Sequence, residues 1–134
     1  MSTTLCLDFT TNWNGKLFMD NFSTVRLLNH GKYFVGNEME IKLRGVSFGY
    51  AKVIAVRPFR YKQISDVLSY IDIGKPAHYL GSLIEKFYSK KVDLNRETEL
   101  HHIVLHYTQR NIENQRAAIQ DWWEGIVNKT QTAA

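Results

Sequence analysis

The chain has 134 residues, of which 44% are hydrophobic and 22% charged, ordinary values for a globular protein that exclude a disordered chain. The single cysteine, Cys6, excludes an intrachain disulfide framework and a cysteine-rich zinc site. No apolar run is long enough for a signal peptide or a membrane span. We therefore expect one cytoplasmic domain with no membrane contact and no cofactor.

The net charge of +4 is concentrated in the middle of the chain. Residues 26–62 carry a net charge of +6, whereas residues 1–25 and residues 63–134 each carry −1. Aromatic residues are interleaved with these basic residues, and that pattern is typical of nucleic-acid-binding surfaces. A solvated, Lys-rich sheet edge would have the same composition.

The first thirty residues predict two short strands. Leu5, Leu7 and Phe9 alternate with other residues in the first strand, residues 3–9, and residues 23–28 form a second β-prone run. Residues 10–15 have the Asn, Gly and Thr content of a turn. Residues 17–22 fit a short helix or an irregular turn beneath the sheet.

Residues 39–56 predict a β-hairpin. Apolar and charged residues alternate strictly over residues 39–43, and residues 44–47 can form the turn. The second run, residues 48–56, is rich in aromatic and β-branched residues. We expect it to end at Arg57 because Pro58 cannot donate a backbone hydrogen bond. This hairpin should form the centre of a small barrel or rolled sheet.

Two helices and a strand are expected after the hairpin. Ser65 and Asp66 mark the start of a helix, which Gly74 and Pro76 interrupt. A second helix follows, because apolar residues recur there at helical spacing: Leu80, Leu83, Ile84 and Phe87. Residues 92–99 read as a polar loop, and residues 100–108 as a last strand with alternating faces.

A final helix should begin after Asn111 and reach about Val127. Its apolar residues fall broadly on one side: Ile112, Ile119, Trp122, Trp123 and Ile126. Adjacent Trp residues on a helix are about 100° apart, so both can be buried only in a groove or across a subunit boundary. We predict that at least one of Trp122 and Trp123 packs against the sheet. Exposure would instead indicate a protein partner or a homodimer.

The order and spacing of these elements resemble the ASCH family, small domains of the PUA-like β-barrel fold. The resemblance covers about residues 5–110. It rests on Thr24-Val25-Arg26, on Gly36-Asn37 before a strand, and on the runs GYAKVIAV, LGSLIEKFY and HHIVLHY. It implies an α+β fold, a mixed PUA-like barrel with short flanking helices. Residues 1–110 would form this barrel, and residues 111–134 would be an added C-terminal helix and tail in the same domain.

The resemblance implies an RNA-related role, and some compact ASCH proteins hydrolyse acetylated cytidine with a Lys, a Thr and a Glu around one pocket. Thr24 matches the catalytic Thr position. Asn21 stands where the Lys is expected, and Ile73 where the Glu is expected, with Asp72 beside it. We expect this chemistry to be missing unless Lys16, Lys32 or Asp72 substitutes.

Three function classes follow, in this order of preference. The first is nucleic-acid binding without catalysis, with RNA as the expected ligand, and the second is an ASCH-type enzyme with a rearranged site that uses Thr24 and Asp72. The third is a protein-interaction module that uses the C-terminal helix. For nucleic-acid binding, the candidate residues are basic side chains for phosphates and aromatic rings for bases: Arg26, Lys32, Tyr33, Lys42, Arg44, Phe48, Tyr50, Lys52 and Arg57.

Three histidines invite a metal interpretation: His101, His102 and His106. On a strand, however, His101 points away from the other two. His102 and His106 are about 13 Å apart by strand rise, too far to share one ion. We expect no metal site and interpret these as solvent-facing histidines.

Overall fold

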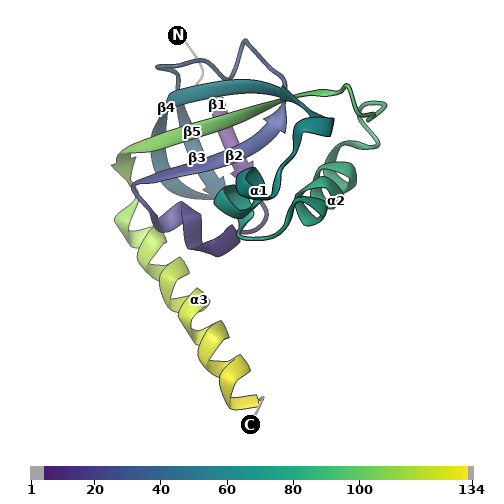
Figure 1. Ribbon diagram of the computed structural model, residues 1–134. Coiled ribbons are helices and arrows are strands. Elements are labelled where there is room, and N and C mark those ends of the chain that lie inside the picture. The colour runs from purple at the N-terminus through teal and green to yellow at the C-terminus, as the bar shows by residue number, and fades with distance from the viewer. Residues whose placement is uncertain (1–4, 133–134) are drawn as a thin grey trace.

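The computed structural model describes residues 5–132, with side chains as far as Gly125. It is a mixed α+β fold, in which a five-stranded sheet curls into a half-barrel (Figure 1). The elements are, in order, β1 (Leu5–Phe9), the 3-10 helix η1 (Trp13–Phe18), β2 (Asn21–Leu27), β3 (Glu38–Leu43), β4 (Val46–Arg60), the 3-10 helix η2 (Tyr61–Gln63), α1 (Asp66–Ile73), α2 (Ala77–Tyr88), β5 (Glu99–Arg110) and α3 (Ile112–Thr132).

The strand order β1-β3-β4-β5-β2 places the two N-terminal strands at opposite edges of the sheet. β1 runs parallel to β3, and the other neighbouring pairs are antiparallel. Within the described residues no ladder joins β1 to β2, so the half-barrel stays open along a seam between them. η1 lies between β1 and β2 in the chain and connects the two strands at one end of this seam.

The core has two parts because the sheet is buried on both faces near β2. The first fills the half-barrel and contains large side chains such as Leu7, Met39, Phe48 and Leu105. The second lies between the sheet and the two helices α1 and α2: Val25, Ile73, Leu80, Ile84 and Leu100. Together they cover both faces of β2, which explains why four consecutive residues of this strand, 22–25, are buried.

The hairpin prediction is confirmed, but β4 is longer than expected. β3 pairs with β4 only as far as Lys52, whereas β5 accompanies β4 to Arg60. Pro58 therefore lies where β4 has a single partner strand, and its missing N–H interrupts no second ladder. The predicted end of the strand at Arg57 is wrong for this reason. The first predicted strand is confirmed from Leu5; its expected start at Thr3 lies outside the described residues.

The two central helices begin and end at the predicted signals. The Ser65 hydroxyl accepts a hydrogen bond from the Leu68 N–H at 3.2 Å and caps α1. Gly74 ends α1 in the left-handed conformation, with φ of 71°, and α2 starts after Pro76. The last strand extends beyond the prediction on both sides, from Glu99 to Arg110.

The C-terminal helix begins as predicted but does not lie on the sheet. The Asn111 side chain accepts from the Asn114 N–H at 3.1 Å, and α3 then extends away from the half-barrel to Thr132 (Figure 1). Trp122 is 46% exposed and Trp123 is 59% exposed. Trp122 contacts the Phe18 ring of η1 edge-on, at 6.3 Å between ring centres. The prediction that one Trp packs against the sheet is wrong, because Trp122 contacts η1 rather than a strand and Trp123 is exposed.

Candidate functional site

The open seam between β1 and β2 is bridged by the side chain of Arg26. Its guanidinium donates to the backbone carbonyl of Asp8 at 2.7 Å and lies 4.7 Å from the centre of the Phe9 ring. A side chain therefore spans the seam in place of a backbone ladder. Space remains beside this bridge because side chains, unlike paired strands, do not fill the gap continuously.

A cavity of about 210 Å³ occupies the seam. This volume is below that of pockets for drug-sized ligands, which begin at roughly 300 Å³, and suits a smaller molecule. Its polar lining includes Thr24, Lys16, Arg26 and Asp72. Its apolar wall comes largely from α2 and the aromatic residues nearby: Phe9, Trp13, Leu80, Leu83, Ile84, Phe87 and Tyr88.

Lys16 reaches this cavity because η1 contains a sharp turn. Asn14 and Gly15 have φ of 57° and 66°, in the left-handed region that Asn and Gly tolerate best. The Asn12 side chain accepts from the Leu17 N–H at 2.8 Å and closes the turn. As a result Lys16 is buried, with only 8% of its surface exposed.

Asp72 meets Lys16 at the floor of the cavity. The Lys16 ammonium lies 3.1 Å from Asp72 Oδ1, and the Ser23 hydroxyl donates to the same oxygen at 3.0 Å. Asp72 sits in the last turn of α1, where the helix dipole disfavours a carboxylate. Lys16 and Ser23 offset this disadvantage, so three separate segments of the chain hold the carboxylate in place.

Thr24 completes the polar group. It is buried in β2, lines the cavity, and its hydroxyl oxygen accepts from Arg26 Nε at 3.2 Å. An oxygen that accepts from a guanidinium keeps its own proton available for donation. One cavity therefore joins a hydroxyl, a buried amine, a carboxylate and a permanent cation.

Burial changes the acidity of the amine. Desolvation lowers the pKa of Lys16 below its ordinary value of 10.5, the Arg26 charge acts in the same direction, and Asp72 opposes both. The net effect is a lowered pKa, because Lys16 is almost fully removed from water. A lowered pKa gives the amine a larger neutral fraction, which a general base requires.

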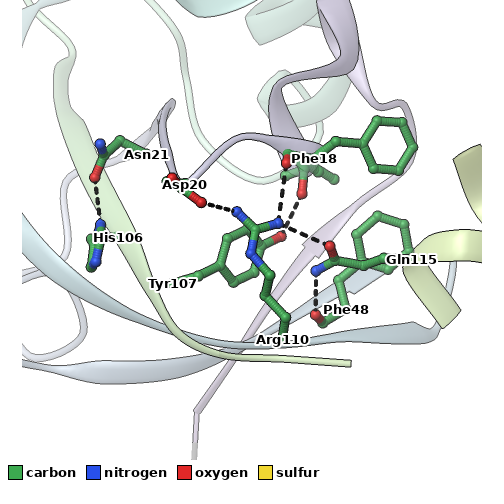
Figure 2. A network of polar contacts seen from close by, with 9 residues as sticks. Phe18, Asp20, Asn21, Phe48, His106, Tyr107, Arg110 and Gln115 are labelled. Carbon is green, nitrogen blue, oxygen red and sulfur yellow. Dashed lines mark hydrogen bonds and ion pairs between the residues drawn. The ribbon is translucent and has the colours of Figure 1, made fainter. Parts of the chain in front are cut away.

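A second polar network fixes η1 from the opposite end and is drawn in Figure 2. Arg110 donates to the Phe18 carbonyl at 3.1 Å and to the Gln115 side chain at 3.0 Å, and it pairs with Asp20. The Tyr107 hydroxyl donates to the Leu17 carbonyl at 2.8 Å. The two residues that accept these hydrogen bonds, Leu17 and Phe18, follow Lys16 directly in the chain. β5 and the start of α3 therefore hold the segment that carries the amine.

The structure separates the residues predicted to bind nucleic acid. Arg26 lines the cavity, and Lys32 is half-buried in the loop before β3. The rest are distributed over the sheet and its hairpin turn: Lys42, Arg44, Tyr50, Lys52 and Arg57. Acidic residues are interleaved with them, since Lys42 lies 3.7 Å from Glu40 and Lys52 pairs in register with Glu38.

Two of the predicted stacking residues are wrong. Phe48 is 1% exposed and Tyr33 is 7% exposed, and both belong to the core of the half-barrel. Neither ring can stack on a base without unfolding. Of the three aromatic candidates, only Tyr50 has part of its surface exposed. For Phe48 the reason is that alternation on a strand does not distinguish the inner from the outer face of the sheet. Tyr33 lies in the loop before β3, and its burial depends on how that loop packs.

The histidines of β5 alternate as predicted, but only His106 is solvent-facing, since His102 is half-buried and its Nε2 is buried without a hydrogen-bond partner among the described residues. His101 points into the half-barrel, is 1% exposed, and accepts from the Asn29 N–H at 3.1 Å. His106 is exposed and bonds to Asn21 at 2.7 Å (Figure 2). Across the described part of the chain, no three His, Cys, Asp or Glu residues gather in a way that could hold a metal ion.

The sequence identified part of this site. Thr24 and Asp72 were candidates for catalysis, and Lys16 was one of three named substitutes for the missing acid or amine. Lys32, another of them, does not line the cavity. The sequence did not point to Ser23. Ser23 is buried next to Thr24 because β2 is covered by a core on each face, and only the folded chain shows this.

Comparison of the chain with family models, curated proteins and solved structures finds no match. Among the described residues, no helix is long and apolar enough to cross a membrane.

Proposed function

We propose that the seam cavity is an active site that removes an acyl group from the amino group of a small substrate, such as an acylated nucleobase or nucleoside. One observation carries this proposal: Thr24, Lys16 and Asp72 line a single cavity although they come from three separate segments. The resemblance to ASCH domains supports it, because some of those proteins use a Thr, a Lys and an acid around one pocket.

The chemistry assigns one role to each group. The Thr24 hydroxyl oxygen attacks the acyl carbon while its proton passes to the neutral Lys16 amine. The negative charge that forms on the carbonyl oxygen is stabilised by Arg26. Lys16 then returns the proton to the departing nitrogen as the carbon–nitrogen bond breaks. Water then attacks the resulting Thr ester while Lys16 accepts a proton from the water molecule. The bond between the acyl carbon and the Thr24 oxygen breaks, Lys16 returns the proton to that oxygen, and the carboxylic acid leaves.

Asp72 positions the amine of Lys16. A carboxylate that accepts from both Lys16 and Ser23 fixes the position of the amine rather than taking part in bond changes. The aromatic and aliphatic wall of the cavity suits a planar, weakly polar ring, and the small volume excludes a folded polymer.

The test is incubation of the purified protein with acetylated cytidine and measurement of released acetate. We expect turnover that falls about 10²- to 10⁴-fold in Thr24→Ala and in Lys16→Met, and that persists in part in Thr24→Ser. Thr108→Ala, a matched change on the exposed side of β5, should keep full activity. Absence of turnover on acetylated nucleosides and nucleobases would refute the proposal, as would turnover unaffected by Thr24→Ala.

A second proposal, nucleic-acid binding on the outer face of the sheet, has its own supporting observation. Arg44, Lys52 and Arg57 are exposed, and within the described residues none of them lies at ion-pair distance from a carboxylate. Such cations are free to neutralise phosphates.

The experiment for this proposal is RNA binding over a range of salt concentrations. Replacing Arg44, Lys52 and Arg57 by Ala should weaken binding and reduce the salt slope by roughly two units for a single strand. The control replaces Lys75, Lys86 and Lys90 by Ala, which changes the net charge equally around α2. Equal losses in both triple variants would indicate a non-specific charge effect and would reject this face.

A further inference from the structure

Along its length α3 carries large apolar side chains that nothing else in the described chain buries. Ile112 is 51% exposed, Ile119 is 43% exposed and Trp123 is 59% exposed. On a helix of 3.6 residues per turn these three positions fall within about 40° of one another, so they form one stripe. We call these three residues the α3 stripe.

The stripe is separate from the side of α3 that faces the barrel. Asn114 donates to the Ser47 carbonyl at 2.9 Å, Gln115 donates to the Phe48 carbonyl, and Trp122 contacts Phe18. These contacts fix the rotation of α3 about its axis. The α3 stripe therefore lies next to the barrel-facing side, roughly 100° around the helix from the mean direction of these contacts, and Figure 1 shows the helix extending clear of the sheet.

We infer that the α3 stripe binds the same stripe of a second copy, with the two helices antiparallel. The spacing of seven residues between Ile112 and Ile119 is the repeat by which paired helices keep one seam in contact. A different protein could bind without any symmetry in α3. The charged residues beside the stripe are, however, arranged symmetrically along the helix, as a second copy requires.

The charges decide the orientation. Arg116 and Glu124 lie on the same side of the stripe, and each is four residues from Gln120. In an antiparallel pair centred at Gln120, Arg116 of each copy is level with Glu124 of the other, and flanks of the same side meet. In a parallel pair in register, each charged residue would instead be level with the identical residue of the other copy. The antiparallel pair thus forms two symmetric ion pairs.

The same arrangement brings Ile119 and Trp123 of the two copies together, whereas Ile112 lies level with residue 128 of the other copy. Ile119 of one copy lies within two residues, or about 3 Å along the axis, of the position opposite Trp123 of the other. Within the described residues Arg116 has no ion-pair partner and Glu124 has only the neutral amide of Gln120, at 3.2 Å. Both charged groups are therefore free for the second copy.

The test is sedimentation of the full chain over a roughly hundredfold range of concentration. We expect a monomer–dimer equilibrium that Ile119→Glu abolishes, because it places a charge in the apolar seam. Val67→Glu, a matched change at an exposed apolar residue of α1, should leave the equilibrium unchanged. A chain that is monomeric throughout, or a dimer that survives Ile119→Glu, would overturn the inference.

The orientation is tested by exchanging the charges. Arg116→Glu should weaken the dimer about tenfold or more, since it sets like charges together at two symmetric places, and Glu124→Arg should do the same. The double variant Arg116→Glu with Glu124→Arg should restore the affinity. Failure of the double variant to recover would overturn the antiparallel arrangement, and the recovery also shows that neither single change acts by unfolding α3.

Discussion

The buried pair of Lys16 and Asp72 contributes differently to stability and to the proposed function. Both are nearly inaccessible to water, and taking two such charges out of water costs several kcal/mol each before their attraction is counted. Buried ion pairs of this kind are often no more stabilising than apolar residues of similar size. The pair at the floor of the cavity is therefore better explained by the chemistry that we propose than by the needs of folding.

This explanation predicts different outcomes for single and double substitutions. Lys16→Met alone should lower the free energy of unfolding by about 3–5 kcal/mol, because it leaves the Asp72 carboxylate buried and unpaired. Adding Asp72→Leu should recover most of that loss, while acyl hydrolysis stays abolished. Denaturant unfolding of the three proteins checks this. A double variant as unstable as the single one would mean that the pair is structural.

The pKa of Lys16 predicts the pH dependence of stability. Because burial lowers this pKa in the folded protein, the unfolded chain binds more protons between the lowered value and the ordinary value of 10.5. The contribution of Lys16 to the free energy of unfolding should therefore rise with pH across that window. The measurement is the difference in unfolding free energy between the wild type and Lys16→Met with Asp72→Leu. A difference that is constant or falls with pH would contradict the direction of the shift.

At the scale of elements, the hairpin β3–β4 and the strand β5 meet at Gly49. This residue has φ of 124°, and a Cβ there would overlap the Gln109 carbonyl oxygen and crowd Arg110. The close approach brings the end of β5 against β4, and Arg110 then reaches η1 from that point. A backbone contact in the sheet thus helps to place the segment that carries Lys16.

Gly49→Ala and Gly45→Ala form a matched pair that tests this contact. Gly45, in the hairpin turn, also has a positive φ of 81°, but a Cβ there meets nothing within 4 Å. Gly45→Ala should cost about 1–2 kcal/mol, the strain of the left-handed conformation alone. Gly49→Ala should cost clearly more because the overlap adds to the strain. Equal changes in the thermal midpoint would show that β5 can shift without penalty.

At the scale of the whole molecule, α3 has two consecutive parts with different roles. Its first two turns belong to the barrel, since Asn114 and Gln115 satisfy the carbonyls of Ser47 and Phe48. Its outer part makes few contacts with the rest of the described chain and carries two residues of the α3 stripe, Ile119 and Trp123. A single helix thus contributes to the fold at one end and presents an apolar surface at the other.

Two truncations separate these parts. A chain that ends at Gln120 should melt close to the wild-type midpoint when both are dilute enough to be monomeric. A chain that ends at Arg110 should melt lower, because it exposes Phe48 and leaves two carbonyls without their partners. Thermal unfolding followed by circular dichroism at low concentration is the measurement. If both truncated chains melt alike and unchanged, all of α3 is an appendage.

The sequence by itself determined the local structure. The cap at Ser65, the left-handed end at Gly74 and the apolar stripe of α2 are confirmed because each depends on interactions within a few residues. Thr24 and Asp72 could be selected as candidates from the resemblance to a family. Capping residues and apolar periodicity predict local structure whatever the order of the strands in the sheet.

Only the tertiary structure decided what these elements form together. Lys16 and Asp72 are 56 residues apart in the chain and meet because the strand order leaves a seam between β1 and β2. The same order buries Phe48 and Tyr33 and leaves Trp123 outside. Residue patterns state that a side chain is apolar or charged, but not which other segment it meets. That depends on long-range packing, in which the two edges of an open half-barrel come together around one cavity.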